Sequence, residues 1–409
     1  MPDHVTQFGY AEGGVVAPLG FLASGVSAGI KRTGKRDICL IAAEQTAAAA
    51  AVFTQNTMAA PPVALSRRHV ADGHVRAVVI NSGNANACTG PQGLRDAEAM
   101  ARATAEAVGC SPEEVIVGST GVIGVPMPID VVVTGIAEAA GELDADSAAG
   151  DAAAEAIMTT DTFAKQTAVT VEVGGEHYTV GGIAKGSGMI MPNMATMLAV
   201  ITTDAPLTST ACDIALRAAV AETFNRITVD SDTSTNDMCV LLASGAAGGR
   251  DITSGSPSFA LVSEAIREVC GELARMIVRD GEGASRFVTV TVRGASSPDD
   301  AQAAAFAVAN SPLVKTAIFG GDANWGRVVM AVGKSGVQVD PERIEVLFAG
   351  LSVCRDGTAV AFDEEAAAAA LAEPESEVVV DLHIGEAQAT VWTCDLSYEY
   401  VRINGEYRT

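Results

Sequence analysis

The chain has 409 residues and carries 26 Lys and Arg against 50 Asp and Glu, which gives a formal net charge of −24 at pH 7. Its 48% hydrophobic content can supply a large buried core and so excludes global disorder. Because the overall field repels phosphate, the composition disfavours nucleic acid and anionic membranes as partners. The most apolar stretch, 189–201, is interrupted by Pro192 and Asn193 and is shorter than the ~18 residues of a membrane span. With no signal peptide visible at the N-terminus, the sequence predicts a cytoplasmic protein.

Strand-like and helical segments alternate in the first half of the chain. Apolar residues at helical spacing predict a helix over 94–108, and Gly109 is placed as its C-terminal stop. Short segments rich in β-branched residues predict buried strands at 38–42, 75–80, 115–117, 169–173 and 178–183. The last two of these would form a hairpin that turns at Gly174 and Gly175.

The second half continues the alternation. Helical spacing predicts helices at 209–224, 259–278 and 364–372. Strand-like segments lie at 226–229, 287–292, 343–348 and 377–384. This order of elements predicts an α/β or α+β fold in which sheets are buried under helices.

Two local motifs resemble known functional loops but differ from them at required positions. Gly25-Val26-Ser27-Ala28-Gly29 has the spacing of a nucleophile elbow, yet no helix start follows it, so a glycine loop is the favoured interpretation. The acidic stretch 230–237 lacks the Gly and Glu that a calcium loop needs, which favours a hydrogen-bonded turn after the 226–229 strand. The eight cysteines and five histidines are scattered without zinc-ligand spacing, so the sequence predicts no metal and no bound cofactor.

One cluster of positive charge contrasts with the acidic chain, namely Lys31, Arg32, Lys35 and Arg36. Such a cluster either meets an anionic group or forms a solvated loop, and the solvated loop is favoured. The glycine-rich stretch 118–124 is not a phosphate-binding P-loop, because it lacks the Lys-Ser/Thr ending.

The stretch 185–205 joins a glycine loop to a Pro-Asn turn, then to Thr196 and an apolar strand. The small Ala195 leaves its carbonyl open to attack by the Thr196 hydroxyl, which would convert the amide to an ester that water can cleave. The freed α-amine of Thr196, with a pKa of ~7.7–8.0, would then serve as the base for its own hydroxyl. A structural turn also fits an Ala-Thr pair, so this chemistry alone leaves both interpretations open.

The same stretch is one of five blocks that occur in order between Val16 and Thr409. Together they resemble the ornithine acetyltransferase family, the glutamate N-acetyltransferases of arginine biosynthesis. Long, ordered motifs over nearly the full chain make this resemblance specific. The other four blocks are Asn-Ser-Gly-Asn-Ala-Asn-Ala-Cys-Thr-Gly at 81–90, Gly-Ser-Thr-Gly-Val-Ile-Gly at 118–124, Asp-Ser-Asp-Thr-Ser-Thr-Asn-Asp at 230–237 and Gly-Gly-Asp-Ala-Asn-Trp-Gly-Arg at 320–327.

The resemblance implies a self-cleaving enzyme with an N-terminal nucleophile, cut between Ala195 and Thr196 into an α chain (1–195) and a β chain (196–409) that form one catalytic unit. The acetyl group of N2-acetylornithine would pass to Thr196 and then to glutamate in a ping-pong scheme. Bifunctional members of the family also accept acetyl-CoA, which makes it a possible co-substrate. The implied fold is a four-layer α/β/β/α sandwich of the ornithine acetyltransferase and DmpA-like type, assembled as a heterotetramer of two α and two β chains.

The resemblance also implies roles for single residues. Thr120 and Gly121 match an oxyanion-hole pair, which would offset the negative charge that develops when a carbonyl is attacked. Lys185 suits a substrate carboxylate, and Glu282 suits an ammonium group. The positions that match substrate contacts are Thr159, Lys185, Thr196, Glu282, Asn404 and Thr409.

Two other functions stay open. A self-processing amidohydrolase or aminopeptidase of the same fold would use water as the acceptor in place of glutamate. A binding or scaffold protein would keep the fold uncut. Ornithine release at the same rate with and without glutamate identifies the first of these, and a single uncut chain of 41.6 kDa identifies the second.

Overall fold

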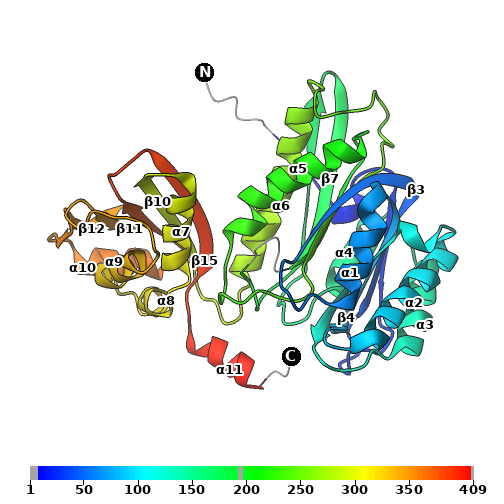
Figure 1. The fold of residues 1–409 in the computed structure, drawn as a ribbon, viewed down its shortest axis with the longest axis horizontal. Helices are drawn as coiled ribbons and strands as arrows, with labels where there is room; N and C mark the ends of the chain where they lie inside the picture. Colours follow the sequence, from blue (N-terminus) through cyan, green and yellow to red (C-terminus); the bar gives the residue numbers. More distant parts are fainter. Residues whose placement is uncertain (1–7, 192–196, 407–409) are drawn as a thin grey trace.

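The computed structural model describes residues 8–191 and 197–406, which form two lobes of unequal size (Figure 1). The larger lobe is built on a nine-stranded sheet and the smaller lobe on a six-stranded sheet. Helices alternate with the strands of both sheets, which confirms the predicted α/β class. The strands of the larger lobe are β1 (Gly9–Ala11), β2 (Phe21–Val26), β3 (Ile38–Phe53), β4 (His74–Asn84), β5 (Val115–Val122), β6 (Lys165–Val173), β7 (Glu176–Lys185), β8 (Leu198–Thr203) and β9 (Met238–Ala243). Its helices are α1 (Pro61–His69), α2 (Gly90–Val108), α3 (Ile129–Gly141), α4 (Ser147–Ala156), α5 (Ser209–Glu222) and α6 (Phe259–Arg279).

Strand β3 joins two halves of the large sheet. Its first part pairs with β2 and β4, and its last six residues, 48–53, pair with β9. Side chains alternate along a strand, and the buried odd-numbered residues from Cys39 to Phe53 all face one core. The even-numbered residues face a second core near Ile38 and a third core near Val52. A single strand therefore contributes to three cores.

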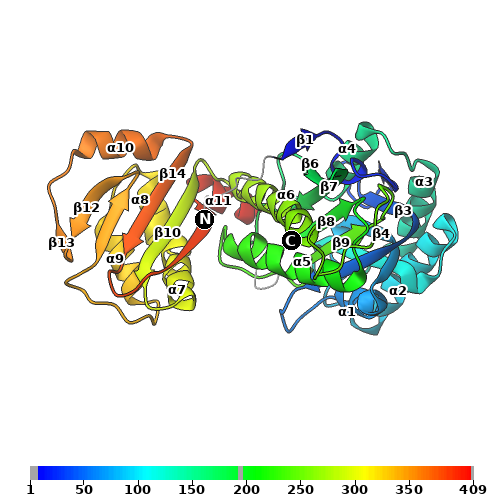
Figure 2. The same ribbon diagram turned by 90° about the horizontal axis from the view of Figure 1, so that it is seen from above.

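The larger lobe has four layers (Figure 2). Helices α5 and α6 cover the half of the sheet that contains β6–β9, and α2 and α3 cover the half that contains β3–β5. The middle core lies between the two halves. The sequence of β8 is continuously apolar because both faces of the strand are buried. Val200 faces the middle core, and Ile201 faces α5 and α6. The four-layer α/β/β/α sandwich is thereby confirmed.

The smaller lobe has a hydrophobic core of its own, which the sequence did not predict. Its strands are β10 (Phe287–Ala295), β11 (Glu345–Phe348), β12 (Leu351–Arg355), β13 (Thr358–Ala359), β14 (Glu375–Asp381) and β15 (Ala387–Cys394). Its helices are α7 (Pro298–Ala309), α8 (Pro312–Phe319), α9 (Trp325–Gly333) and α10 (Glu364–Ala372). After β15 the chain forms α11 (Tyr398–Glu406), which returns toward the larger lobe (Figure 1).

Several predicted elements are confirmed. The helix predicted over 94–108 is the main part of α2, and Gly109 ends it with a φ of 76°. The predicted hairpin is the pair β6 and β7, and the helix predicted over 364–372 is α10.

One prediction is wrong, and another is only partly correct. Residues 226–229 do not form a strand, because the chain makes a 3-10 turn at Phe224–Arg226 and then a single bridge from Ile227 to Trp392. The apolar character of this segment reflects packing against α5 and α6. The predicted glycine loop at 25–29 is only partly correct, because Gly25 and Val26 end β2 and the loop begins at Ser27. A Cβ on Gly25 would lie 1.9 Å from the carbonyl oxygen of Ala152. Glycine therefore allows α4 to pack against β2.

The predicted cleavage position lies between β7 and β8, inside the larger lobe. These strands are antiparallel neighbours, with Lys185 opposite Leu198. Chains 1–195 and 196–409 would therefore contribute adjacent strands to one sheet. Ala195 and Thr196 lie outside the described residues, and the two chain boundaries stay a prediction.

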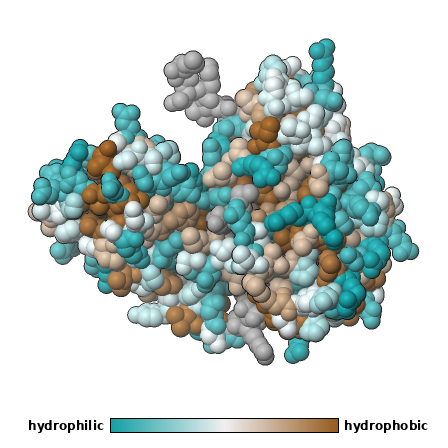
Figure 3. Space-filling model, viewed as in Figure 1, coloured by the Kyte–Doolittle hydropathy of each residue, from teal (hydrophilic) through white to brown (hydrophobic). Residues whose placement is uncertain are grey.

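One face of the molecule carries hydrophilic and hydrophobic residues side by side (Figure 3). Figure 3 shows hydrophilic residues over much of both lobes on the face in view, in keeping with the −24 net charge. No helix within 8–191 and 197–406 is long and apolar enough to cross a membrane. The same ranges contain no group of three or more His, Cys, Asp or Glu side chains that could hold a metal ion.

Candidate active site

A cavity of about 140 Å³ in the larger lobe brings together most of the predicted site residues. Six of them line it, namely Thr120, Gly121, Thr159, Lys185, Glu282 and Asn404. The other three, Ala195, Thr196 and Thr409, lie outside the described residues. However, Met197, which follows Thr196 in the sequence, also lines the cavity. This cavity is therefore the candidate active site.

The segment after β7 forms one wall of the cavity and leads toward the predicted cleavage position. The carboxylate of Asp230 accepts hydrogen bonds from the backbone N–H groups of Met189 at 2.6 Å and Ile190 at 2.8 Å. Burial raises the pKa of Asp230, and these two donors act in the opposite direction. Asp230 thus holds the wall in place, a contact that the 230–237 block did not by itself indicate.

Thr120 and Gly121 lie near the end of β5, which runs parallel to β4. Gly83 is opposite Gly121, and a Cβ on Gly121 would lie 2.4 Å from the carbonyl carbon of Gly83. The φ of Gly121 is 129°, which also favours glycine. The half-buried Thr120 hydroxyl has no hydrogen-bond partner in the part of the chain that the structure describes. It is therefore available to donate to a developing oxyanion.

Replacing Thr120 with alanine is expected to lower kcat by about 10²–10³-fold with little change in KM, because an oxyanion donor acts mainly in the transition state. Steady-state acetyl transfer measures both constants. Thr160→Ala is the matched control, since Thr160 lines the same cavity without a predicted role. If both substitutions lower kcat equally, Thr120 has no special part in the reaction.

Two buried charges of opposite sign line the cavity. Lys185 is 9% exposed and forms no ion pair with any described residue. Glu282 is 8% exposed, and its Oε2 accepts a hydrogen bond from Asn404 Nδ2 at 2.7 Å. A Cβ on Gly188 would lie 2.3 Å from the carboxyl carbon of Glu282, so glycine provides room for this side chain. The pair suits a zwitterionic ligand whose carboxylate meets Lys185 and whose ammonium meets Glu282.

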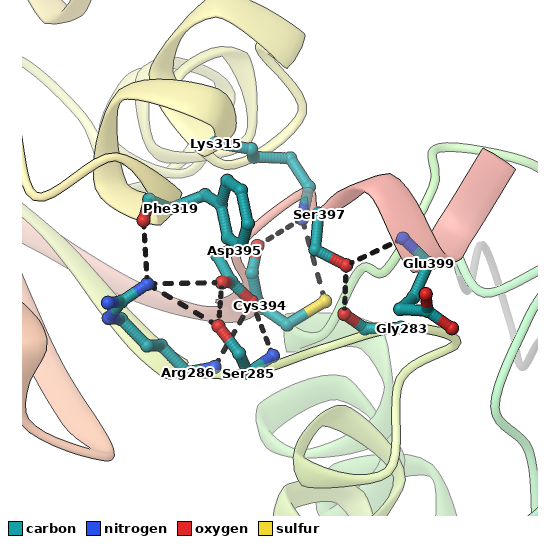
Figure 4. A network of polar contacts seen from close by, with 9 residues as sticks. All are labelled: Gly283, Ser285, Arg286, Lys315, Phe319, Cys394, Asp395, Ser397 and Glu399. Atoms are coloured by element: carbon teal, nitrogen blue, oxygen red, sulfur yellow. Dashed lines mark hydrogen bonds and ion pairs between the residues drawn. The ribbon is translucent and has the colours of Figure 1, made fainter. Parts of the chain in front are cut away.

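A polar network fixes the segment that carries Glu282 against the segment that leads into α11 (Figure 4). The buried Asp395 accepts a hydrogen bond from the backbone N–H of Ser285 at 2.8 Å. The hydroxyl of Ser397 donates to the carbonyl of Gly283 at 2.5 Å. These contacts join the residues just after Glu282 to the residues just before α11. They therefore position Glu282 and the α11 residue Asn404, which both line the cavity.

The sequence analysis missed a buried ion triad beside the cavity. Lys165 Nζ lies 2.7 Å from Asp161 Oδ1 and 2.5 Å from Asp280 Oδ2. The carboxylate of Asp161 also accepts hydrogen bonds from the N–H groups of Thr159 at 2.9 Å and Gly186 at 2.7 Å. The triad therefore supports both segments that carry predicted substrate contacts. Its only sequence signal was the position of Asp161 two residues after Thr159.

Asp237 was missed as well. It lines the cavity, is 2% exposed, and its Oδ2 has no hydrogen-bond partner among residues 8–191 and 197–406. Burial raises its pKa well above the usual range, although the Ser234 hydroxyl and the Lys185 charge act against this shift. A raised pKa favours the protonated form of this carboxyl, which can donate a hydrogen bond at the cavity wall. Nothing in the acidic stretch distinguished Asp237 from its neighbours.

Comparisons with known proteins identify the family. The model of the ArgJ family matches residues 22–409. The arginine biosynthesis bifunctional protein ArgJ of Symbiobacterium thermophilum is 54% identical over 97% of this chain and 99% of its own length. The protein of the same name from Geobacter sulfurreducens is 51% identical over 95% of this chain and 99% of its own length. A crystal structure of ArgJ from Bacillus halodurans is 44% identical, covers 50% of this chain and 97% of its own, and has a TM-score of 0.49. The family match and the two full-length relatives confirm the resemblance found in the sequence: this chain belongs to the ArgJ family.

Proposed function

We propose that this chain transfers the acetyl group of N2-acetyl-L-ornithine to L-glutamate through an acetyl ester on Thr196, giving L-ornithine and N-acetyl-L-glutamate. The observation that carries the proposal is the cavity in which the buried Lys185 and Glu282 line the same space as Thr120. Opposite charges suit amino-acid substrates, and a Thr120 hydroxyl with no partner among the described residues suits acyl transfer. The relatives named for arginine biosynthesis support these substrates.

Self-cleavage prepares the nucleophile. The Thr196 hydroxyl attacks the Ala195 carbonyl, the C–N bond breaks as the nitrogen takes a proton, and an ester remains. Water then cleaves the ester, which releases the Ala195 carboxylate and restores the hydroxyl. The new α-amine, with a pKa of ~7.7–8.0, serves as the base. The pairing of β7 with β8 supports two chains that stay together, and we include a heterotetramer of two α and two β chains in the proposal.

In the transfer, the Thr196 hydroxyl attacks the acetyl carbonyl of N2-acetylornithine. Negative charge develops on the carbonyl oxygen, and Thr120 supplies a hydrogen-bond donor to it. The α-nitrogen of ornithine takes a proton as its bond to carbon breaks, and ornithine leaves. The deprotonated amine of glutamate then attacks the ester and regenerates the hydroxyl. Lys185 binds the α-carboxylate that both substrates share, so one site serves both half-reactions.

A second donor enters the same scheme. Acetyl-CoA can form the same acetyl ester and would make the enzyme bifunctional. The full-length relatives carry the word bifunctional in their names, which supports this extension. The chemistry requires no metal ion and no bound cofactor, and we place the reaction in the cytoplasm.

Ornithine release from N2-acetylornithine, measured with and without glutamate, tests the proposal. Without glutamate, release is expected to stop at one ornithine per active site, and with glutamate it should continue and match the N-acetylglutamate formed. Ornithine and free acetate in the absence of glutamate would instead indicate an amidohydrolase. With N2-acetylornithine alone, intact-mass analysis should detect one acetyl group on the 196–409 chain.

A further inference from the structure

A second cavity, with a volume of about 1210 Å³, opens beside the active site. Thr159 lines both cavities. Gly83 lines the second cavity and Gly121 lines the first, and these residues are opposite each other in β4 and β5. The paired backbones of β4 and β5 therefore separate the two cavities at this point, and Thr159 lies where both cavities meet the same residue.

The second cavity concentrates positive charge in an acidic chain. It is lined by Lys31, Arg32, Lys35 and Arg36, although the net charge of the chain is −24. Glu155 also lines it, but Glu155 Oε2 is paired with Arg36 Nε at 3.1 Å. Arg32 and Lys35 are exposed and have no ion-pair partner within the ranges that the structure describes. The local field of this cavity therefore attracts anions.

The loop that carries these charges, residues 27–37, is held in place by the carboxylate of Asp37. The fully buried carboxylate of Asp37 accepts hydrogen bonds of 2.7 to 3.1 Å from three backbone N–H groups within residues 28–31. Lys31 Nζ donates to the carbonyl of Met158 at 2.7 Å, which connects the loop to the residue before Thr159. Burial lowers the pKa of Lys31 to about 8, a shift that a bound anion would oppose. The loop thus keeps most of its basic side chains exposed to solvent, as the sequence favoured, while its backbone is anchored.

Apolar side chains complete the wall. Phe163 is 42% exposed and Val125 is 45% exposed, and both line the second cavity. An exposed aromatic ring suits the stacking of a flat heterocyclic base, and Arg and Lys suit phosphate groups. An aromatic face beside clustered cations is the chemistry that recognises a phosphorylated nucleotide.

We propose that the second cavity binds the nucleotide part of acetyl-CoA, while the thioester end reaches past Thr159, which lines both cavities, to the active site. This inference rests on the proposed function, because it gives the second acyl donor a place. The active-site cavity of about 140 Å³ suits an amino acid and not a nucleotide, so a large donor must extend beyond it. The acetyl carbon forms a bond to Thr196 Oγ as its bond to sulfur breaks, and the hydroxyl proton ends on the thiol of CoA.

A double charge reversal, Arg32→Glu with Lys35→Glu, tests the inference on the self-cleaved enzyme. The Kd of CoA, measured by titration calorimetry, and the KM of acetyl-CoA are each expected to rise about tenfold or more. Transfer from N2-acetylornithine is expected to keep its rate and KM. The matched control is Lys334→Glu with Arg343→Glu, which changes the net charge equally at exposed residues of the smaller lobe and should leave all of these values unchanged.

Two fragments of CoA show which part of the ligand the cavity holds. The double reversal should weaken the binding of adenosine 3′,5′-bisphosphate and leave that of pantetheine unchanged. Equal CoA affinity in parent and variant, an equal loss in the control pair, or no CoA binding by the parent would each overturn the inference. Acetylornithine-to-glutamate transfer on the same samples reports separately on the proposed function. If this transfer persists while the CoA results fail, only the nucleotide site is wrong. If the parent enzyme shows no transfer, the proposed function itself is wrong.

Discussion

Replacing Thr196 with alanine is expected to leave one uncut chain of 41.6 kDa and to abolish acetyl transfer. Without the hydroxyl, neither the Ala195 carbonyl nor the acetyl carbonyl meets a nucleophile, so both reactions fail together. Removal of a catalytic nucleophile lowers kcat by about 10⁶-fold in a well-studied hydrolase, and a loss of that order is expected here. Intact-mass analysis and the transfer assay, run on the same sample, measure the two outcomes.

Thr196→Ser is the matched comparison, because it retains a hydroxyl at the same position. It is expected to support partial cleavage and slower transfer, whereas Thr160→Ala in the same cavity should be cut fully. Cleavage between residues 195 and 196 in the alanine variant would show that Thr196 is not the nucleophile of self-processing. Normal transfer by an uncut alanine variant would remove it from the acetyl transfer as well.

Strand β3 shows what local pattern could and could not predict about the fold. The β-branched segment 38–42 indicated its beginning, but the exposed residues 44–46 interrupt the apolar pattern and hide the continuation to Phe53. The alanines that follow are weak strand formers, and their strand is set by pairing with β9. The passage of one strand between two halves of a sheet depends on tertiary contacts that no sequence window contains.

The sequence likewise predicted some residues of the candidate site and missed others. Thr120 and Lys185 were found because each lies in a recognisable block, and Glu282 was found because it matches a substrate contact of the family. The structure places all three around one cavity. The triad was missed because Lys165 and Asp280 are 115 positions apart, and neither has a motif of its own. The sequence also did not show that the basic loop 27–37 lines a cavity, because only the fold places its charges on the wall of the second cavity.

Replacing Lys165 with methionine is expected to lower the free energy of unfolding by about 3–5 kcal/mol near neutral pH. The side chains of Lys165, Asp161 and Asp280 are at most 2% exposed, so loss of the cation leaves two buried carboxylates without their ion-pair partner. Methionine keeps the long apolar stem, so packing changes little. Urea denaturation in the uncut Thr196→Ala background measures this free energy on a single chain.

The pH dependence of this loss separates charge from packing. Burial raises the pKa of Asp161, but Lys185 and Lys165 outweigh it and hold the pKa well below its usual range. A carboxyl whose folded-state pKa is lowered contributes stability above its unfolded value of ~3.9, and the contribution disappears as the pH falls through the folded-state value. Without Lys165, part of the effect that lowers this pKa is lost, so protonation relieves the buried charge at a higher pH than in the parent protein. The difference between the two proteins should therefore be largest near neutral pH and smaller at about pH 4.

A surface ion pair provides the control for this experiment. Arg217 Nε lies 2.9 Å from Asp213 Oδ1, and both side chains are about half exposed, at 55% and 45%. Arg217→Met is expected to lower the free energy of unfolding by at most ~1 kcal/mol, because water screens an exposed pair. Equal losses from the two substitutions would show that the triad does not stabilise the fold through its charges. A loss at Lys165 that stays constant with pH would assign the effect to packing, since only ionised carboxylates need the cation.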